Sequence, residues 1–181
     1  MGRPLRAAQG GLVYHTLSRA DARLTIFEDE GDFTAFARIL AEAVTRYGMR
    51  LLAYCLMPNH FHLLLWPRGD NDLSQFMQWL TLTHTQRWHA QRQSVGSGHL
   101  YQGRFKSFPV QSDDHFLTVC RYVERNALRA KLAPRAGDWR WGSLARGNTS
   151  DADAVPMLSR WPIARPPDWT RRVNMPMTPA E

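Results

Sequence analysis

The chain has 181 residues, 44% of them hydrophobic, which is enough for one domain with a buried core. Its 23 Lys and Arg exceed its 16 Asp and Glu, and the resulting net charge of +7 favours a polyanionic partner such as nucleic acid. The sequence shows neither an apolar run of membrane-spanning length nor a signal-peptide pattern, so we expect a cytoplasmic protein without a membrane partner.

Periodicity along the chain predicts alternating strands and helices. Apolar residues recur every three to four positions in the helical segments, whereas short continuous apolar runs mark the strands. Gly48 ends the first helix, Pro58-Asn59 forms a turn between two strands, and Asp72 can cap the second helix. In chain order, the elements are a strand at 12–18, a helix at 33–47, strands at 50–57 and 61–66, a helix at 73–88, a strand at 104–110 and a helix at 113–132. This βαββαβα order fits an α+β ferredoxin-like sandwich with an antiparallel sheet.

The composition changes after Leu132. Six prolines crowd the last 26 residues, so we expect no regular structure there. Four tryptophans punctuate the region after Leu132, which leaves two interpretations: an extended strap pinned onto the domain, or a partly disordered terminus. We therefore divide the chain into a domain at 1–145 and a proline-rich C-terminal segment at 146–181. Cys55 and Cys120 fall in apolar patterns and are expected to be reduced core residues.

Two histidines on alternate residues, His60 and His62, lie at the start of the third predicted strand. Alternate side chains of a strand share one face and lie about 7 Å apart along the chain, so two imidazoles can reach one divalent metal ion. For an isolated His-x-His, the more frequent alternative is a pair of histidines on the polar face of a half-buried strand. A nucleophile close to the pair would favour the metal site.

The helix predicted at 113–132 carries a candidate nucleophile. At 100° per residue, Tyr122 and Asn126 fall beside one edge of the apolar stripe, with Arg125 and Arg129 next to Tyr122. A phenol one turn from an amide oxygen, among positive charges, suits a metal-bound phosphodiester. The alternative is a tyrosine at the rim of an amphipathic helix, which is a common arrangement.

These motifs resemble the HUH single-tyrosine transposases, in particular the REP-associated tyrosine transposases. The resemblance covers roughly residues 12–145, and its most specific part is the block Met57-Pro58-Asn59-His60-Phe61-His62-Leu63. The other matching stretches include Tyr14-His15, Gly103-Arg104-Phe105-Lys106-Ser107-Phe108, Tyr122-Val123-Glu124-Arg125-Asn126-Ala127 and Trp139-Arg140-Trp141-Gly142-Ser143.

The resemblance implies a fold, a reaction and a set of site residues. The fold is again the antiparallel ferredoxin-like sandwich. A divalent metal ion, Mg²⁺ or Mn²⁺, held by His60, His62 and the amide oxygen of Asn126, would polarise a scissile phosphate. Tyr122 would attack phosphorus, giving a 5′-phosphotyrosine bond and a free 3′-hydroxyl, so that the DNA can be rejoined. Such a reaction needs no nucleotide cofactor, and the chain has no Gly-Lys-Ser/Thr phosphate loop.

The substrate implied by the resemblance is single-stranded DNA beside a hairpin-forming palindromic repeat. Its unpaired bases could stack on aromatic residues such as Phe108 or Trp66. Basic residues around the predicted site are candidates for phosphate contacts, although for each residue taken alone a place on a solvated surface is the more frequent alternative. These candidates are Arg19, Arg104, Lys106, Arg121 and Arg125.

Two alternative functions stay open at the level of sequence. A catalytically inactive module with this fold would bind a DNA or RNA hairpin independently of Tyr122. A metal-dependent hydrolase would use the two histidines with water and would need a carboxylate base, but Glu124 is predicted to point away from Tyr122 on the helix. The presence of His60, His62, Tyr122 and Asn126 together favours the transposase.

Overall fold

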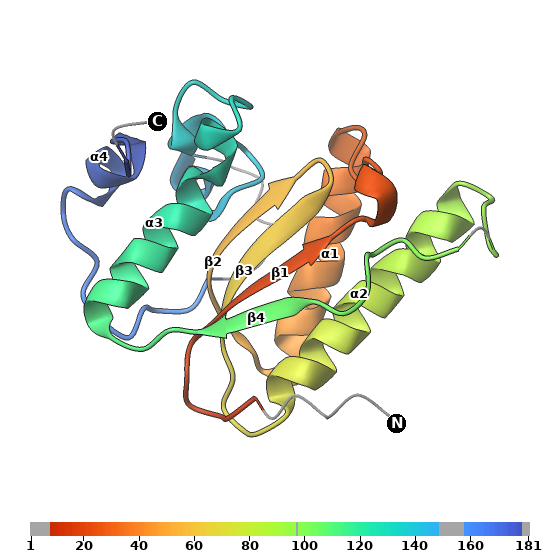
Figure 1. Ribbon diagram of the computed structural model, residues 1–181, viewed down its shortest axis with the longest axis horizontal. Coiled ribbons are helices and arrows are strands. Elements are labelled where there is room, and N and C mark those ends of the chain that lie inside the picture. Colours follow the sequence, from red (N-terminus) through yellow and green to blue (C-terminus); the bar gives the residue numbers. More distant parts are fainter. Residues whose placement is uncertain (1–7, 97, 149–157, 179–181) are drawn as a thin grey trace.

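One antiparallel sheet of four strands forms the centre of the part of the chain that is described (Figure 1). The computed structural model describes residues 8–96, 98–148 and 158–178. The strands lie in the order β2-β3-β1-β4, and every neighbouring pair is antiparallel. Their bounds are Tyr14–Arg19 for β1, Arg50–Met57 for β2, His60–Trp66 for β3 and Lys106–Pro109 for β4. The fold is the ferredoxin-like α+β sandwich that the sequence predicts.

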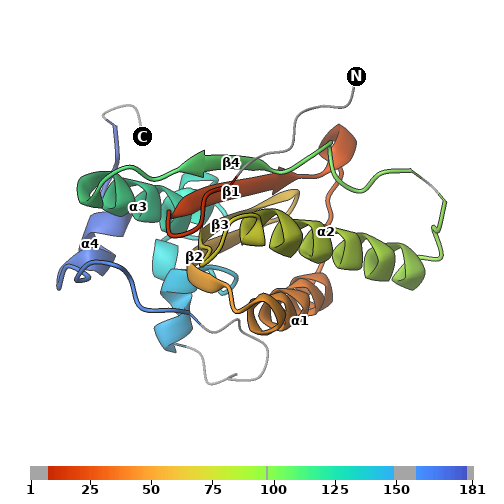
Figure 2. The ribbon, with the colours of Figure 1, turned by 90° about the horizontal axis from the view of Figure 1, so that it is seen from below.

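Helices cover both faces of this sheet. Helices α1 (Glu30–Tyr47) and α2 (Asp72–Gln91) lie on one face, and α3 (Asp113–Arg129) lies on the other, as Figures 1 and 2 show. The short helix α4 (Trp169–Asn174) packs against α3. Three short 3₁₀-helices among the described residues complete the structure: η1 (Asp21–Arg23), η2 (Ala136–Asp138) and η3 (Ser143–Asn148).

The alternation of side chains along β3 separates two hydrophobic cores. Phe61, Leu63 and Leu65 are fully buried in the core beneath α1 and α2. The intervening residues point to the opposite face, where Leu64 is buried in the core beneath α3. His60 and His62 have the same parity as Leu64, so both histidines lie on the α3 face of the sheet.

Two helix ends differ from the prediction for local reasons. Helix α3 ends at Arg129, not at residue 132, because Lys131 adopts a left-handed conformation with φ of 59°. The N-cap of α2 is Asn71, not Asp72. Asp72 is the first helical residue, and its carboxylate accepts a hydrogen bond from the backbone N–H of Gly69 at 2.7 Å.

Strands β4 and β1 also differ in their bounds from the prediction. The predicted strand at 104–110 is shorter, because Gly103 turns the chain with a φ of 66° and β4 begins only at Lys106. β4 is an edge strand that pairs with β1 alone. The strand predicted at 12–18 lies at Tyr14–Arg19.

The expectation of no regular structure in the proline-rich C-terminal segment is wrong for one stretch. Helix α4 forms between Pro167 and Pro176, where Trp169 is 3% exposed and Val173 is fully buried in the core beneath α3. Two apolar side chains one turn apart can therefore dock a short helix between flanking prolines. Residues 149–157 and 179–181 of the segment lie outside the described residues, and the boundary at 145 stays a prediction.

Both cysteines are buried and free, as the sequence predicts. Within the described ranges, no helix combines the length and the apolar character needed to cross a bilayer.

Candidate active site

His60 and His62 lie side by side at the start of β3, with ring centroids 5.1 Å apart and ring planes at 79°. His62 is 3% exposed, whereas His60 is partly exposed. The Nδ1 atom of His60 lies 2.6 Å from Oδ1 of Asn59, and the Nδ1 atom of His62 lies 2.9 Å from Nε2 of His15. Because both Nδ1 atoms are engaged, Nε2 is the atom that each ring can offer to a ligand.

Helix α3 brings Tyr122 against these histidines. The half-buried Tyr122 ring meets His62 edge-on at a centroid distance of 5.6 Å, and it meets His15 edge-on at 5.7 Å. The predicted nucleophile and the predicted metal-binding pair therefore lie in one cluster, although they are separated by sixty residues in the chain.

The third histidine in the cluster, His15, is a residue that sequence reasoning did not assign to the site. It lies on β1, where Leu17 pairs with His62 and Arg19 pairs with His60. His15 is thus the diagonal neighbour of His62; the two ring planes are nearly parallel, at 18°, and the ring centroids lie 5.1 Å apart. Tyr14-His15 is among the stretches that carry the resemblance, but only the register between β1 and β3 places His15 against His62.

Burial keeps the three imidazoles neutral. It lowers the pKa of His15 to about 4. Burial, with a smaller contribution from the charge of Arg19, lowers the pKa of His60 to about 4. Burial is also the main reason that the pKa of His62 is lowered to about 2, with His15, His60 and Arg19 adding to the effect. Neutral imidazole is the form that binds a metal ion.

Asn126, the predicted oxygen ligand, lies one turn after Tyr122 and is 8% exposed. Its Nδ2 donates to the backbone carbonyl of Tyr122 at 2.9 Å, so the amide oxygen is the atom that could serve a metal ion. The described residues contain no group of three or more His, Cys, Asp or Glu side chains arranged to hold a metal ion. Imidazole nitrogen and amide oxygen are both donor types that divalent ions accept.

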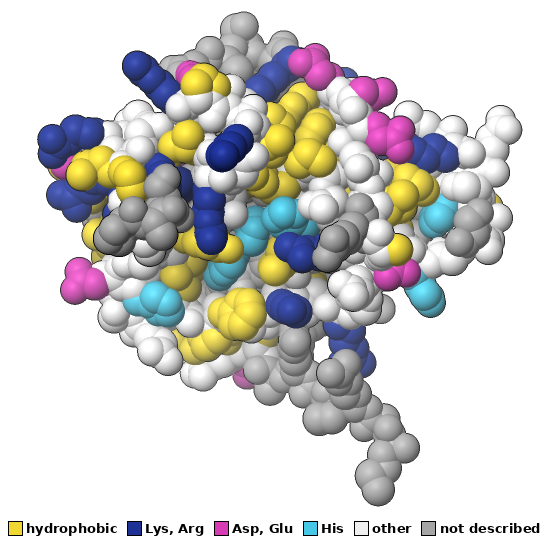
Figure 3. Space-filling view, turned by 45° about the horizontal axis from the view of Figure 1, so that its top comes forward, with side chains coloured by type: hydrophobic (Ala, Val, Ile, Leu, Met, Phe, Trp, Pro, Cys, Tyr) yellow, Lys and Arg dark blue, Asp and Glu magenta, His cyan; other side chains and the backbone are white. Residues whose placement is uncertain are grey.

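Two predicted DNA contacts, Arg19 and Lys106, lie on the same sheet face as the histidines. Arg19 is exposed and pairs with His60, while Lys106 is exposed and pairs with Leu17, the partner of His62. Figure 3 shows histidine side chains gathered near the centre of one face of the molecule, with Lys and Arg side chains around them. The face of the sheet that carries the histidines therefore presents positive charge beside the imidazoles.

The two aromatic candidates for base stacking have different surroundings. Phe108 on β4 is 52% exposed, and its ring centroid lies 6.1 Å from that of His15. Trp66 donates its indole N–H to the carbonyl of Gly11 at 2.9 Å, and the Arg50 guanidinium lies 3.5 Å from its ring centroid. Phe108 is thus the more accessible ring and the one beside the histidine cluster.

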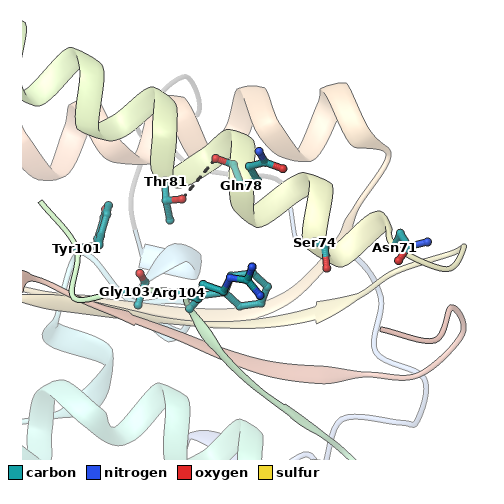
Figure 4. Close-up of a pocket in the computed structure, with 9 residues that line it drawn as sticks. Asn71, Ser74, Gln78, Thr81, Tyr101, Gly103 and Arg104 are labelled. Carbon is teal, nitrogen blue, oxygen red and sulfur yellow. Dashed lines mark hydrogen bonds between the residues drawn. The ribbon is translucent and has the colours of Figure 1, made fainter. Parts of the chain in front are cut away.

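Arg104, also predicted to contact DNA, lies apart from the histidines. It lines a cavity of about 410 Å³ between α2 and the segment that leads into β4 (Figure 4). The α2 wall of this cavity is polar and comprises Asn71, Ser74, Gln78 and Thr81. Ser18 also lines the cavity, and its place in the alternation of β1 puts the cavity on the α2 side of the sheet, opposite the histidines.

Arg121 and Arg125, the last two predicted DNA contacts, hold the C-terminal segment. Arg121 donates through Nη2 to the carbonyls of Met175 and Pro176 at 2.7 and 2.9 Å. Arg125 is only 6% exposed and donates through Nη1 to the carbonyl of Val173 at 3.0 Å. Their role toward DNA stays a prediction, whereas their contacts with residues 173–176 are observed.

Tyr122 also lines a basic cavity. Its volume is about 700 Å³, and Arg125, Arg129 and Lys131 supply its positive charge. Met177 and Thr178 from the C-terminal segment complete the wall. Sequence analysis placed Arg129 beside Tyr122 on the helical wheel but proposed neither it nor Lys131 as a contact to the substrate.

A tyrosine set against paired histidines on the central strands of a ferredoxin-like sheet is the arrangement that the resemblance to single-tyrosine transposases implies. Residues 8–126 match the family described as transposase IS200-like, and the chain belongs to that family.

Individual relatives agree with the resemblance predicted from the sequence. A REP-associated tyrosine transposase of Haemophilus influenzae is 21% identical over 146 residues, which cover 76% of this chain and 82% of the relative. The solved structure of a REP-associated tyrosine transposase bound to a REP hairpin superposes with a TM-score of 0.61 at 17% identity, covering 81% of this chain and 84% of that one. The similarity to this solved structure confirms the fold.

Proposed function

We propose that this protein is a metal-dependent single-strand DNA endonuclease that cleaves and rejoins DNA beside hairpin-forming repeats. The observation that carries the proposal is the contact of the Tyr122 ring with His62 on β3 and His15 on β1. Membership of a transposase family supports DNA as the substrate, and the solved relative bound to a REP hairpin supports a hairpin as the element recognised.

The reaction would be a transesterification at phosphorus. His60, His62 and Asn126 would hold Mg²⁺ or Mn²⁺, which when bound supplies Lewis-acid polarisation of the scissile phosphate. The phenolic oxygen of Tyr122 forms a bond to phosphorus and loses its proton, while the bond from phosphorus to the 3′ oxygen breaks and that oxygen gains a proton. Because the phosphate stays esterified as a 5′-phosphotyrosine and is not hydrolysed, a second 3′-hydroxyl can attack it and reverse the step without a nucleotide cofactor.

The surroundings of Tyr122 suit a strand that passes over the cluster. Arg19 and Lys106 are exposed on the histidine face, where they can contact phosphates. Phe108 offers an exposed ring on the same face for an unpaired base. The basic cavity next to Tyr122 can hold the backbone on the other side of the scissile phosphate.

A metal-dependent hydrolase fits the structure less well. Glu124, the carboxylate nearest to Tyr122 along α3, is 3% exposed. Its oxygens accept hydrogen bonds from Ser143 Oγ at 2.7 Å and from Trp169 Nε1 at 2.7 Å. A carboxylate that is buried and already engaged in this way cannot activate a water beside the histidines.

A cleavage assay on two substrates tests the proposal. One substrate is a hairpin with an unpaired flank, the other is the same sequence as a full duplex, and both are incubated with Mn²⁺ or with a chelator. We expect cleavage of the hairpin flank only, and only with the metal, because the nucleophile must reach an unstacked phosphate. Binding without cleavage would instead identify an inactive hairpin-binding module, and equal cutting of the duplex would remove the requirement for a single strand.

A further inference from the structure

We propose that His15 is a positioning residue that fixes the tautomer and the orientation of His62. The starting observation is the distance of 2.9 Å between Nε2 of His15 and Nδ1 of His62, which joins two side chains on neighbouring strands. At this distance one nitrogen donates and the other accepts. The direction of that donation decides which nitrogen of His62 is left for a ligand.

The position of the His15 ring is set on three sides. It meets the His62 ring through the two nitrogens with 18° between the ring planes, meets the Tyr122 ring edge-on at 71°, and lies against Phe108 at 36°. Its strand, β1, is held between β3 and β4. A ring enclosed in this way loses little additional conformational entropy when it makes a hydrogen bond, so it can hold a neighbour in place.

The tautomer follows from the donor and acceptor capacity of a neutral imidazole, which carries one N–H and one lone pair. If Nδ1–H of His62 donates to Nε2 of His15, His62 keeps its Nε2 lone pair for a metal ion, and His15 carries its own proton on Nδ1. The opposite direction would place the His62 proton on Nε2 and block that ligand position. We infer the first direction.

His60 provides an internal precedent for this arrangement. The Oδ1 atom of Asn59, 2.6 Å from Nδ1 of His60, can only accept, so Nδ1 of His60 carries the proton and Nε2 carries the lone pair. With His15 as the acceptor for His62, both strand histidines present the same nitrogen. Asn59 and His15 would then have the same role: each accepts a hydrogen bond from the Nδ1–H of one strand histidine and so orients that ring.

Nitrogen NMR of the metal-free protein tests the tautomer directly. In histidine-labelled wild type near pH 7.5, we expect His62 to carry its proton on Nδ1 and to have an unprotonated Nε2. A His62 proton on Nε2 would overturn the inference, whether or not any variant folds and whatever the protein's activity. In His15→Phe, which keeps an aromatic ring but removes the acceptor, His62 should populate both tautomers.

Manganese affinity tests the consequence, which rests on the proposed function. By calorimetry on folded protein, His15→Phe should weaken Mn²⁺ binding about 10- to 100-fold, the usual effect of losing a partner behind a metal ligand. His15→Gln, whose amide oxygen can accept from Nδ1–H, should bind within a few-fold of wild type, and His99→Phe at an exposed position serves as the matched control. Unchanged affinity in His15→Phe would contradict the positioning role. Failure of wild type itself to bind Mn²⁺ would contradict the proposed function and leave the NMR result to decide the tautomer.

Discussion

Buried histidines with strongly lowered pKa values lie on both sides of the sheet, but their surroundings differ. On the α1 and α2 face, His84 is enclosed by Phe27 and Phe36, and its Nδ1 is hydrogen-bonded to the hydroxyl of Tyr101. Burial lowers the pKa of His84 to about 3, and it lowers the pKa of His62 on the other face to about 2. A lowered pKa therefore does not distinguish a site from a core.

Access and neighbours make the distinction. His62 shares its face with the partly exposed His60, the exposed Arg19 and the half-buried Tyr122. His84 shares its surroundings with aromatic rings and with the buried Tyr101. A tyrosine stands beside a histidine on each face, but Tyr101 is buried whereas Tyr122 is half-buried.

The largest expected effect comes from removing the strand histidines. His60→Ala and His62→Ala should each lower cleavage by about 100-fold or more, because the loss of a metal ligand removes several kcal/mol of stabilisation from the transition state. Binding of the hairpin should stay within a few-fold, since phosphate contacts supply most of the affinity. Gel-based cleavage and binding assays on the same preparations measure both quantities.

The matched control on the other face is His84→Phe. It should reduce stability by about 1–3 kcal/mol, because the buried hydroxyl of Tyr101 loses its partner, while cleavage per folded molecule stays within a few-fold. A loss of activity in His84→Phe as large as that in His62→Ala would break the distinction between the two faces.

Removal of the exposed aromatic ring on the histidine face should have the next largest effect. Phe108→Ala should weaken binding of a hairpin with an unpaired flank by about 1–3 kcal/mol if one base stacks on that ring. A 2-aminopurine placed in the flank should regain fluorescence in this variant. Trp66→Ala is the comparison, and we expect a smaller effect because Arg50 already covers that ring. A larger effect of Trp66→Ala than of Phe108→Ala would show that the single-stranded DNA passes over Trp66 instead of Phe108.

The free energy of unfolding should decrease as the pH is lowered below 6.5, because the buried histidines resist protonation in the folded state. Their lowered pKa values lie well below the unfolded value near 6.5, so between pH 6.5 and 5 the unfolded chain takes up protons that the folded protein does not. The stabilisation is complete above pH 6.5 and is lost as the pH falls toward the folded pKa values. His62 and His84 should each contribute up to about 1.4 kcal/mol per pH unit in this window. Denaturant unfolding of wild type and His62→Gln tests this, because the variant should show the shallower slope.

The smallest effect should appear in the salt dependence of binding. Lys106→Ala should reduce the slope of log affinity against log salt by roughly 0.7–0.9, which corresponds to one phosphate contact. Arg104→Ala is the counterpart in the cavity on the opposite face. An equal reduction in Arg104→Ala would show that the DNA extends around the sheet edge to that cavity, whereas no change would confine it to the histidine face.

Local patterns in the sequence were sufficient for much of the fold and for part of the site. Strand alternation placed His60 and His62 on one face, and helical periodicity placed Tyr122 and Asn126 on one flank, because both depend only on neighbours along the chain. The role of His15 depends on the register between β1 and β3, which no local pattern specifies.

Distant contacts explain the other differences. Arg121 and Arg125 carry the positive charge expected of DNA contacts, yet their hydrogen bonds reach residues about fifty positions later, in a segment whose helix α4 was not expected. His84 on helix α2 is buried, and its hydrogen-bond partner, Tyr101, comes from a later loop.

The central claim is that Tyr122 is the nucleophile, and a covalent capture assay tests it most directly. A labelled hairpin with an unpaired flank is incubated with the protein and Mn²⁺, denatured, and any adduct is mapped by peptide mass spectrometry. We predict a denaturant-resistant adduct on Tyr122 that is absent from Tyr122→Phe and retained in Tyr47→Phe, a control on helix α1. An adduct of the same yield from Tyr122→Phe would contradict the account.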